Sequence, residues 1–155
     1  KKFAAMKAQC DFAEWAKVHG FFYATPRRPL DRCVRGGRDI LLDIDVQGAS
    51  KIKRRYPQAV SIFILPPSWR ELQRRLARRG TDGKETIRRR LVNARGEIGE
   101  IIKYDYYVVN REVGTSVQLL KSIVEAERAK TFRVKQWRIE PLHRRQGGRG
   151  REQGN

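Results

Sequence analysis

Two apolar runs constrain the fold of this chain more than any other feature of its sequence. The run from Ile40 to Val46 is ILLDIDV, and the run from Ala59 to Leu65 is AVSIFIL, which Pro66 and Pro67 end. Runs that are apolar on both faces are typical of strands in a parallel sheet covered by helices on both sides. We therefore predict a buried strand in each run.

Helical patterns fill the intervals between and after these runs. Ser68 with Glu71 three residues later forms a capping-box pattern, which begins a helix, and Gly80 is expected to end it. We predict a longer helix from about Lys84 to Ile102, a third strand from Tyr104 to Val109 and a last helix from Ser116 to about Ala129. The alternation of strands and helices predicts the α/β class with a parallel sheet.

The two ends of the chain differ from this pattern. Residues 11–25 are rich in aromatic side chains around Gly20, which predicts a hairpin or a small antiparallel lobe beside the main sheet. Such a lobe can close over a ligand, and an edge ribbon without a ligand fits the pattern equally well. Residues 135–155 are rich in Gly, Arg and Gln and lack periodicity, so we expect a basic, disordered tail after a domain at 1–134.

The charge balance favours an anionic partner. The 155 residues include 35 Lys and Arg against 17 Asp and Glu, a formal net charge of +18, which fits nucleic acid or a phosphorylated small molecule. We find no apolar run of the roughly 18–20 residues that a membrane span needs. Cys10 and Cys33 have no metal-ligand spacing, so we expect free thiols and a cytoplasmic protein.

Two carboxylates lie near the end of the first apolar run. In a parallel sheet, ligands bind outside the carboxyl ends of the strands. Asp43 and Asp45 are two residues apart, so on a strand they would point to the same side, toward one ligand or Mg²⁺ site. The alternative is a buried structural salt bridge with an arginine.

Three arginines flank a Gly-Thr-Asp-Gly segment between two predicted helices. Arg75 and Arg79 precede it and Arg90 follows it. Guanidinium groups match phosphate oxygens, and an arginine-bearing helical hairpin that folds over a polyphosphate neutralises charge as a phosphoryl group moves. The alternative is a solvated basic face.

Glu14 lies among Phe12, Trp15 and Ala16, an apolar setting for a carboxylate. A glutamate accepts two hydrogen bonds side by side, so it can bind the N1–H and 2-amino edge of guanine, which adenine lacks. A surface or capping glutamate is the plainer interpretation. Tyr23 and Thr25 offer hydroxyls for phosphate or purine contacts and are equally common in ribbons.

Five segments occur in this order along the chain: EWAKVHGFFYAT, LLDIDVQG, SIFILPPS, RRGTD and YDYYVVN. Together they resemble the guanylate kinase family, and the resemblance extends from Phe3 to about Arg128. The resemblance implies a P-loop kinase-like fold with a GMP-binding lobe at about residues 3–35 and a lid at about 75–95. It also implies in-line transfer of the ATP γ-phosphoryl to GMP with Mg²⁺, catalysed by positioning and electrostatics. GMP and ATP would be the partners, and specific nucleic-acid binding is not expected.

The resemblance also implies roles for single residues. Glu14 would bind the guanine edge, Tyr23 the GMP phosphate and Thr25 the purine, with the Ala24 backbone nearby. Asp45 would belong to the GMP site, with Asp43 beside it near Mg²⁺ and the reacting phosphates. The lid arginines would be Arg79 and Arg90, with Arg75 as a third; Arg79 would also contact ATP, and Asn110 would lie near the adenine.

The sequence departs from the family pattern in two places. Phe22 and Ala24 replace a hydroxyl-bearing residue and a glycine in the GMP lobe. The G-x-x-x-x-G-K-[ST] loop that holds ATP phosphates is absent, and so are the arginines and tyrosine that precede the lobe. We expect the chain to be a piece of a longer kinase, lacking roughly 50–60 residues, and to be unstable or inactive alone.

Two other functions fit parts of the sequence. A guanylate-kinase-like module without a P-loop can bind a protein partner instead of catalysing a reaction, although such a module need not keep Asp43, Asp45, Arg79 and Arg90. The arginine- and glycine-rich tail is typical of segments that bind nucleic-acid backbones without sequence specificity. We treat that binding as an accessory property.

Overall fold

The computed structural model describes residues 2–18, 20–78 and 83–133, which form helices connected by short strands. In chain order the elements are α1 (Lys2–Ala8), β1 (Phe12–Val18), β2 (Phe21–Pro26), α2 (Arg27–Arg35), α3 (Val46–Arg55), β3 (Ile62–Leu65), α4 (Trp69–Arg78), α5 (Lys84–Gly99), η1 (Ile101–Lys103), β4 (Tyr106–Val109), α6 (Val113–Arg128) and η2 (Thr131–Arg133). None of the described helices combines the length and the apolar character needed to cross a bilayer. The predicted tail at 135–155 lies outside the described residues.

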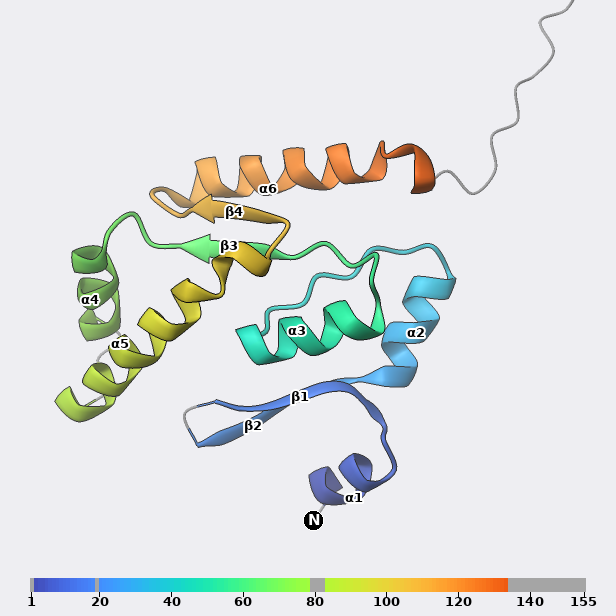
Figure 1. Ribbon diagram of the computed structural model, residues 1–155, viewed down its shortest axis with the longest axis horizontal. Coiled ribbons are helices and arrows are strands. Elements are labelled where there is room, and N and C mark those ends of the chain that lie inside the picture. Colours follow the sequence, from blue (N-terminus) through green and yellow to red (C-terminus); the bar gives the residue numbers. More distant parts are fainter. Residues whose placement is uncertain (1, 19, 79–82, 134–155) are drawn as a thin grey trace, which may run out of the picture.

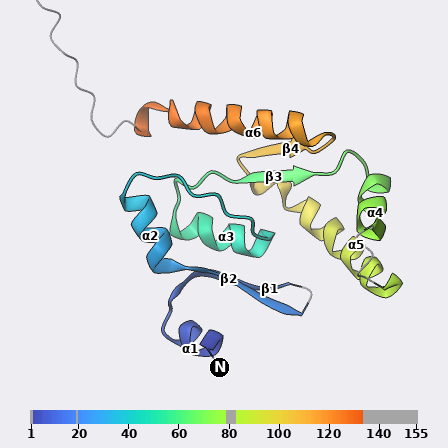
Figure 2. The same cartoon turned by 180° about the vertical axis from the view of Figure 1, so that it is seen from behind.

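The strands form two separate two-stranded sheets. β1 and β2 are an antiparallel hairpin, and β3 and β4 pair in parallel with Ile62 opposite Tyr106 and Leu65 opposite Val109. Helix α3 lies between the hairpin and β3, while α6 runs along the far side of β4, in both views of the molecule (Figures 1 and 2). The parallel pair and the covering helices confirm the α/β class, and the hairpin confirms the antiparallel lobe predicted for residues 11–25.

The strand predicted for residues 40–46 is wrong. Residues 38–45 form no helix or strand, and the side chain of Leu41 is 94% exposed. A β-strand is held by hydrogen bonds to a neighbouring strand, and neither described sheet includes this segment. An apolar sequence without a strand beside it stays irregular, so the expectation that Asp43 and Asp45 share one side of a strand fails with it.

The predicted helices are present with shifted ends. Ser68 Oγ accepts a hydrogen bond from Glu71 N at 3.1 Å and begins α4. Only half of the expected capping box forms, because the Glu71 carboxylate accepts from Arg74 and Arg75. The Gly80 stop lies outside the described residues. The other differences are small: α5 continues into η1, α6 begins at Val113, and β3 and β4 are shorter than their apolar runs.

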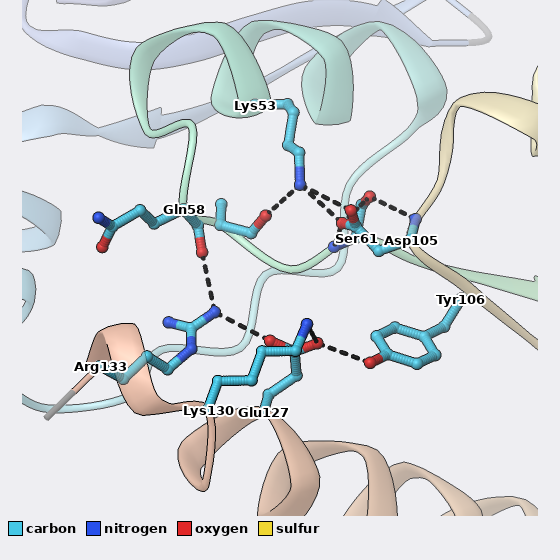
Figure 3. Close-up of polar contacts among 9 residues, drawn as sticks. Lys53, Gln58, Ser61, Asp105, Tyr106, Glu127, Lys130 and Arg133 are labelled. Carbon is cyan, nitrogen blue, oxygen red and sulfur yellow. Dashed lines mark hydrogen bonds and ion pairs between the residues drawn. The ribbon is translucent and has the colours of Figure 1, made fainter.

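Lys53 ties helix α3 to the amino ends of both parallel strands. Its Nζ donates to the Ala59 carbonyl and to Asp105 Oδ2, each at 2.7 Å. Asp105 Oδ2 also accepts from the backbone N and the hydroxyl of Ser61, at 2.7 Å each (Figure 3). These bonds connect one end of α3 to the starts of β3 and β4.

Glu127 of α6 joins that helix to the sheet. Its buried carboxylate accepts from Tyr106 Oη and Lys130 Nζ, both at 2.6 Å, and from Arg133 Nη2 at 3.0 Å. Arg133 also donates to the Gln58 carbonyl at 3.2 Å (Figure 3). Hydrogen bonds from Lys130 and Tyr106, together with that from Arg133, outweigh burial and lower the pKa of Glu127 to about 2.

The lowered pKa of Glu127 makes the free energy of unfolding depend on pH. The folded state holds Glu127 ionised down to a pKa of about 2, whereas the unfolded chain takes up that proton near the ordinary value of 4.5. The contribution of Glu127 is therefore complete above about pH 4.5 and lost as the pH falls toward 2. Glu127→Gln should cost about 1–3 kcal/mol of unfolding free energy at pH 7 and flatten its acid dependence.

Urea unfolding followed by circular dichroism between pH 2 and 7 measures this effect. Glu125→Gln is the matched control, because Glu125 is exposed on the same helix. An acid dependence in Glu127→Gln as steep as in the unaltered chain would contradict the role given to this carboxylate.

Candidate functional site

The hairpin presents one face to helix α3. Antiparallel pairing sets Glu14 opposite Thr25 and Ala16 opposite Tyr23, and residues two apart share a face. Glu14 and Ala16 are buried at 4% and 2% exposure, and β1 packs against α3. Glu14, Tyr23 and Thr25, all predicted from the sequence, therefore lie on one face. Ala24 pairs with Trp15 on the opposite face.

The Glu14 carboxylate is fixed between the hairpin and α3. Oε1 accepts a hydrogen bond from Thr25 Oγ1 at 2.7 Å. Oε2 lies against Gly48 in the first turn of α3. A buried carboxylate is costly unless it is hydrogen-bonded, so the Thr25 hydroxyl stabilises the charge in this position. Tyr23, by contrast, is 58% exposed on the same face.

Asp45 begins helix α3. Its backbone is extended, with φ −75° and ψ 175°, and its Oδ1 accepts from Gly48 N at 2.8 Å. This is the N-cap arrangement, which satisfies one of the free N–H groups at the start of a helix. Asp43 is exposed in the irregular segment just before it. The two aspartates thus lie at the start of α3 and not on a strand.

A cleft of about 430 Å³ opens beside Asp45. Lys17 and Val18 of β1 line it together with Asp45 and the first turn of α3. The rest of the lining comes from α5 and the residue after it: Val92, Asn93, Gly96, Glu97 and Glu100. Glu14 is not among its described lining residues. Burial raises the pKa of the nearby Tyr104 hydroxyl, as do the carboxylates of Asp45, Glu97 and Glu100. The cleft therefore has an acidic wall.

Arg75 joins α4 to the carboxyl end of β4. Its Nη2 donates to the Asn110 carbonyl at 2.9 Å, and its Nε donates to Glu71 Oε1 at 2.8 Å. Hydrogen bonds from Arg74 and Arg75 lower the pKa of Glu71 to about 2. The Asn110 N–H donates to the Leu65 carbonyl at 2.7 Å, so Asn110 sits where both parallel strands end.

The remaining arginines are less defined. Arg90 lies half-buried on α5, and Arg79 lies outside the described residues. Arg95 of α5 stacks over the Trp69 ring of α4, with 5.3 Å from its guanidinium carbon to the ring centre. This contact, together with the packing of α4 on α5, forms the helical hairpin that carries Arg75 and Arg90.

Sequence reasoning missed Gly48 and the α5 wall of the cleft. Gly48 follows Asp45 by three residues, a spacing that indicates a cap bond at the start of a helix but not the contact with Glu14. Glu97 lies on α5 and Glu100 directly follows that helix, a spacing of three that favours a shared face but does not indicate what the face contacts. Among the described residues, no group of three or more His, Cys, Asp or Glu side chains is placed to hold a metal ion.

Comparison with known proteins identifies the family. The sequence profile of the family described as guanylate kinase matches residues 1–127. The chain belongs to the guanylate kinase family. It is 50% identical over 133 residues to a guanylate kinase of Geobacter metallireducens, covering 86% of this chain and 66% of the relative. It is 48% identical over 131 residues to one of Nitrosomonas europaea, covering 84% and 65%.

A solved structure confirms the fold. The crystal structure of guanylate kinase from Anaplasma phagocytophilum matches with a TM-score of 0.73 at 36% identity, covering 85% of this chain and 64% of that one. The chain thus spans somewhat less than two thirds of the length of these guanylate kinases. The resemblance inferred from the motifs is confirmed at the level of family and fold.

Thr25→Val tests the bond that fixes Glu14. The substitution keeps the side-chain shape and removes the hydroxyl, so the buried carboxylate loses its donor at Oε1. We expect Thr25→Val to lower the free energy of unfolding by about 1–3 kcal/mol. Thr25→Ser keeps the hydroxyl and should retain most of the stability of the unaltered chain. Urea unfolding measures both, and equal stabilities for Val and Ser would count against the bond.

Proposed function

We propose that this chain carries the GMP-binding lobe and the lid of a guanylate kinase, within a domain at 1–134 and with a basic tail at 135–155. The reaction transfers the γ-phosphoryl of ATP to GMP. An oxygen of the GMP phosphate forms a bond to the γ-phosphorus, the bond to the β–γ bridging oxygen breaks, and GDP and ADP are released. The supporting observation is the Glu14 carboxylate, held beside the Thr25 hydroxyl on the hairpin face that meets α3.

The GMP site is assigned to the hairpin at about residues 3–35 and the start of α3. Glu14 accepts hydrogen bonds from N1–H and the 2-amino group of guanine, and Thr25 contacts the purine with the Ala24 backbone nearby. Tyr23 binds the phosphate, and its exposed ring on the same hairpin face is compatible with that role. Asp45 lines the cleft that adjoins this face.

The phosphoryl-transfer site is assigned to the lid at about residues 75–95 and the carboxyl ends of the strands. Arg79 and Arg90 neutralise the transferred group, and Arg79 also contacts ATP. Arg75 supports the lid, because its guanidinium bridges Glu71 and the Asn110 carbonyl. Asn110 directly follows β4, a position compatible with a contact to adenine.

Mg²⁺ accompanies the ATP phosphates in this proposal. In such sites Mg²⁺ is held by substrate phosphates, waters and one or two carboxylates, and supplies neutralising charge. Asp43 fits this requirement, because it is exposed just before α3. The described residues contain no group of three or more His, Cys, Asp or Glu side chains placed to hold a metal ion. We assign the enzyme to purine nucleotide metabolism in the cytoplasm, where the free thiols of Cys10 and Cys33 stay reduced.

An assay of ADP formation with ATP, Mg²⁺ and GMP tests the proposal. Two proteins are compared: the 155-residue chain and the same chain extended at its amino end by the P-loop segment of a guanylate kinase. We expect activity only in the extended protein, because the P-loop supplies the amides and lysine that hold the ATP phosphates. Substantial GMP-dependent ADP formation by the 155-residue chain would refute the expected inactivity.

In the extended protein, Glu14→Gln should lower kcat/KM for GMP about 10- to 100-fold, because an amide cannot accept both guanine donors. Glu125→Gln, on the exposed side of α6, is the control and should leave the kinetics unchanged. An extended protein that folds but does not phosphorylate GMP would contradict the proposed function and favour a binding module.

A further inference from the structure

Gly48 lies between the two carboxylates of the GMP site. A β-carbon built on Gly48 would be 3.0 Å from Glu14 Oε2 and 3.2 Å from Asp45 Oδ1. The Gly48 N–H donates to Asp45 Oδ1 at 2.8 Å, and Gly48 itself is buried in the first turn of α3. One backbone position therefore touches a carboxylate of the hairpin and a carboxylate of the helix start.

The glycine is needed here for space and not for its backbone angles. Among the described glycines, positive φ values occur at Gly20 and Gly37, so the backbone of Gly48 would accept any residue. Alanine is a better helix former than glycine, so helix formation alone would favour alanine at this position. The carboxylates of Glu14 and Asp45 favour glycine instead, because they leave too little space for a β-carbon.

A side chain at position 48 would displace Glu14. The β-carbon would also lie 3.2 Å from the Ile44 Cβ, which the backbone holds in place, and Asp45 is fixed by its cap bond. The Glu14 carboxylate is the end of a longer side chain and is the group that can move. A shift of a few tenths of an ångström at Oε2 would strain the 2.7 Å bond between Oε1 and Thr25.

We propose that Gly48 is a positioning residue for guanine binding: the absence of a side chain there sets where the Glu14 carboxylate lies. This proposal rests on the proposed function, in which Glu14 binds the guanine edge. Gly48 acts through Glu14 and touches no substrate. The consequence is a specific one, because a displaced carboxylate loses the 2-amino contact that separates guanine from hypoxanthine.

Gly48→Ala in the chain extended by the P-loop segment tests the proposal, with Gly114→Ala in the same protein as the matched control. Gly114 is also helical, and a β-carbon there would have no atom within 4 Å. A crystal structure of each variant gives the distance from Glu14 Oε1 to Thr25 Oγ1 without any ligand. Equilibrium dialysis with GMP and with IMP, which lacks the 2-amino group, gives the affinities.

We expect Gly48→Ala to shift the Glu14 carboxylate by a few tenths of an ångström, to lengthen the distance from Oε1 to Thr25 Oγ1 and to weaken GMP binding about tenfold. IMP binding should fall much less, so the preference for GMP over IMP should collapse, while Gly114→Ala keeps the bond and the preference. If Gly48→Ala does not crystallise, the chemical shift of the Glu14 carboxyl carbon in the labelled variant reports the same displacement.

Two results would overturn the proposal. One is a Gly48→Ala structure, or a carboxyl carbon shift, that is unchanged at Glu14. The other is an equal loss of GMP and IMP binding, which would indicate a general disturbance of the fold. Failure of the unaltered chain to prefer GMP over IMP would contradict the proposed function instead, and the ligand-free readout would still decide the role of Gly48.

Discussion

The burial of the Glu14 carboxylate is the constraint on which the arrangement of the hairpin and α3 depends. A charge at 4% exposure needs a partner, and the Thr25 hydroxyl opposite it on β2 supplies one. A slip of one residue in the pairing would turn Glu14 to the outer face, where Phe3, Trp15 and Phe22 cluster. The same bond therefore fixes the register of the hairpin and the position of the carboxylate against Gly48.

Helix α3 contacts the hairpin at its start and the amino ends of the parallel strands near its other end. Its first turn holds Asp45 and Gly48 against the hairpin, and near its other end Lys53 binds Asp105 at the amino ends of the parallel strands. Glu127 adds α6 at the amino end of β4. The amino ends of β3 and β4 are thus tied by structural ion pairs, whereas their carboxyl ends, with Asn110, adjoin the helices assigned to the lid. This asymmetry matches the general position of ligand sites in parallel sheets.

Elements with strong local signals could be predicted from the sequence, and features set by distant neighbours could not. The aromatic hairpin, the strand ended by Pro66 and the helix begun by Ser68 each carry their signal within a few residues. The apolar run at 40–46 carries an equally strong strand signal, but a strand also needs a partner for its hydrogen bonds. Gly48 was missed for a similar reason, since only the fold brings Glu14 within 3.0 Å of its β-carbon position.

The proposed GMP site lies on the hairpin and the start of α3. A titration of the isotope-labelled chain, extended by the P-loop segment, with GMP tests it most directly when followed by amide chemical shifts. We expect saturable shifts confined to Glu14, Tyr23, Thr25 and residues 45–48, with much smaller shifts on addition of AMP. Shifts equal for AMP and GMP, or located away from these residues, would contradict it.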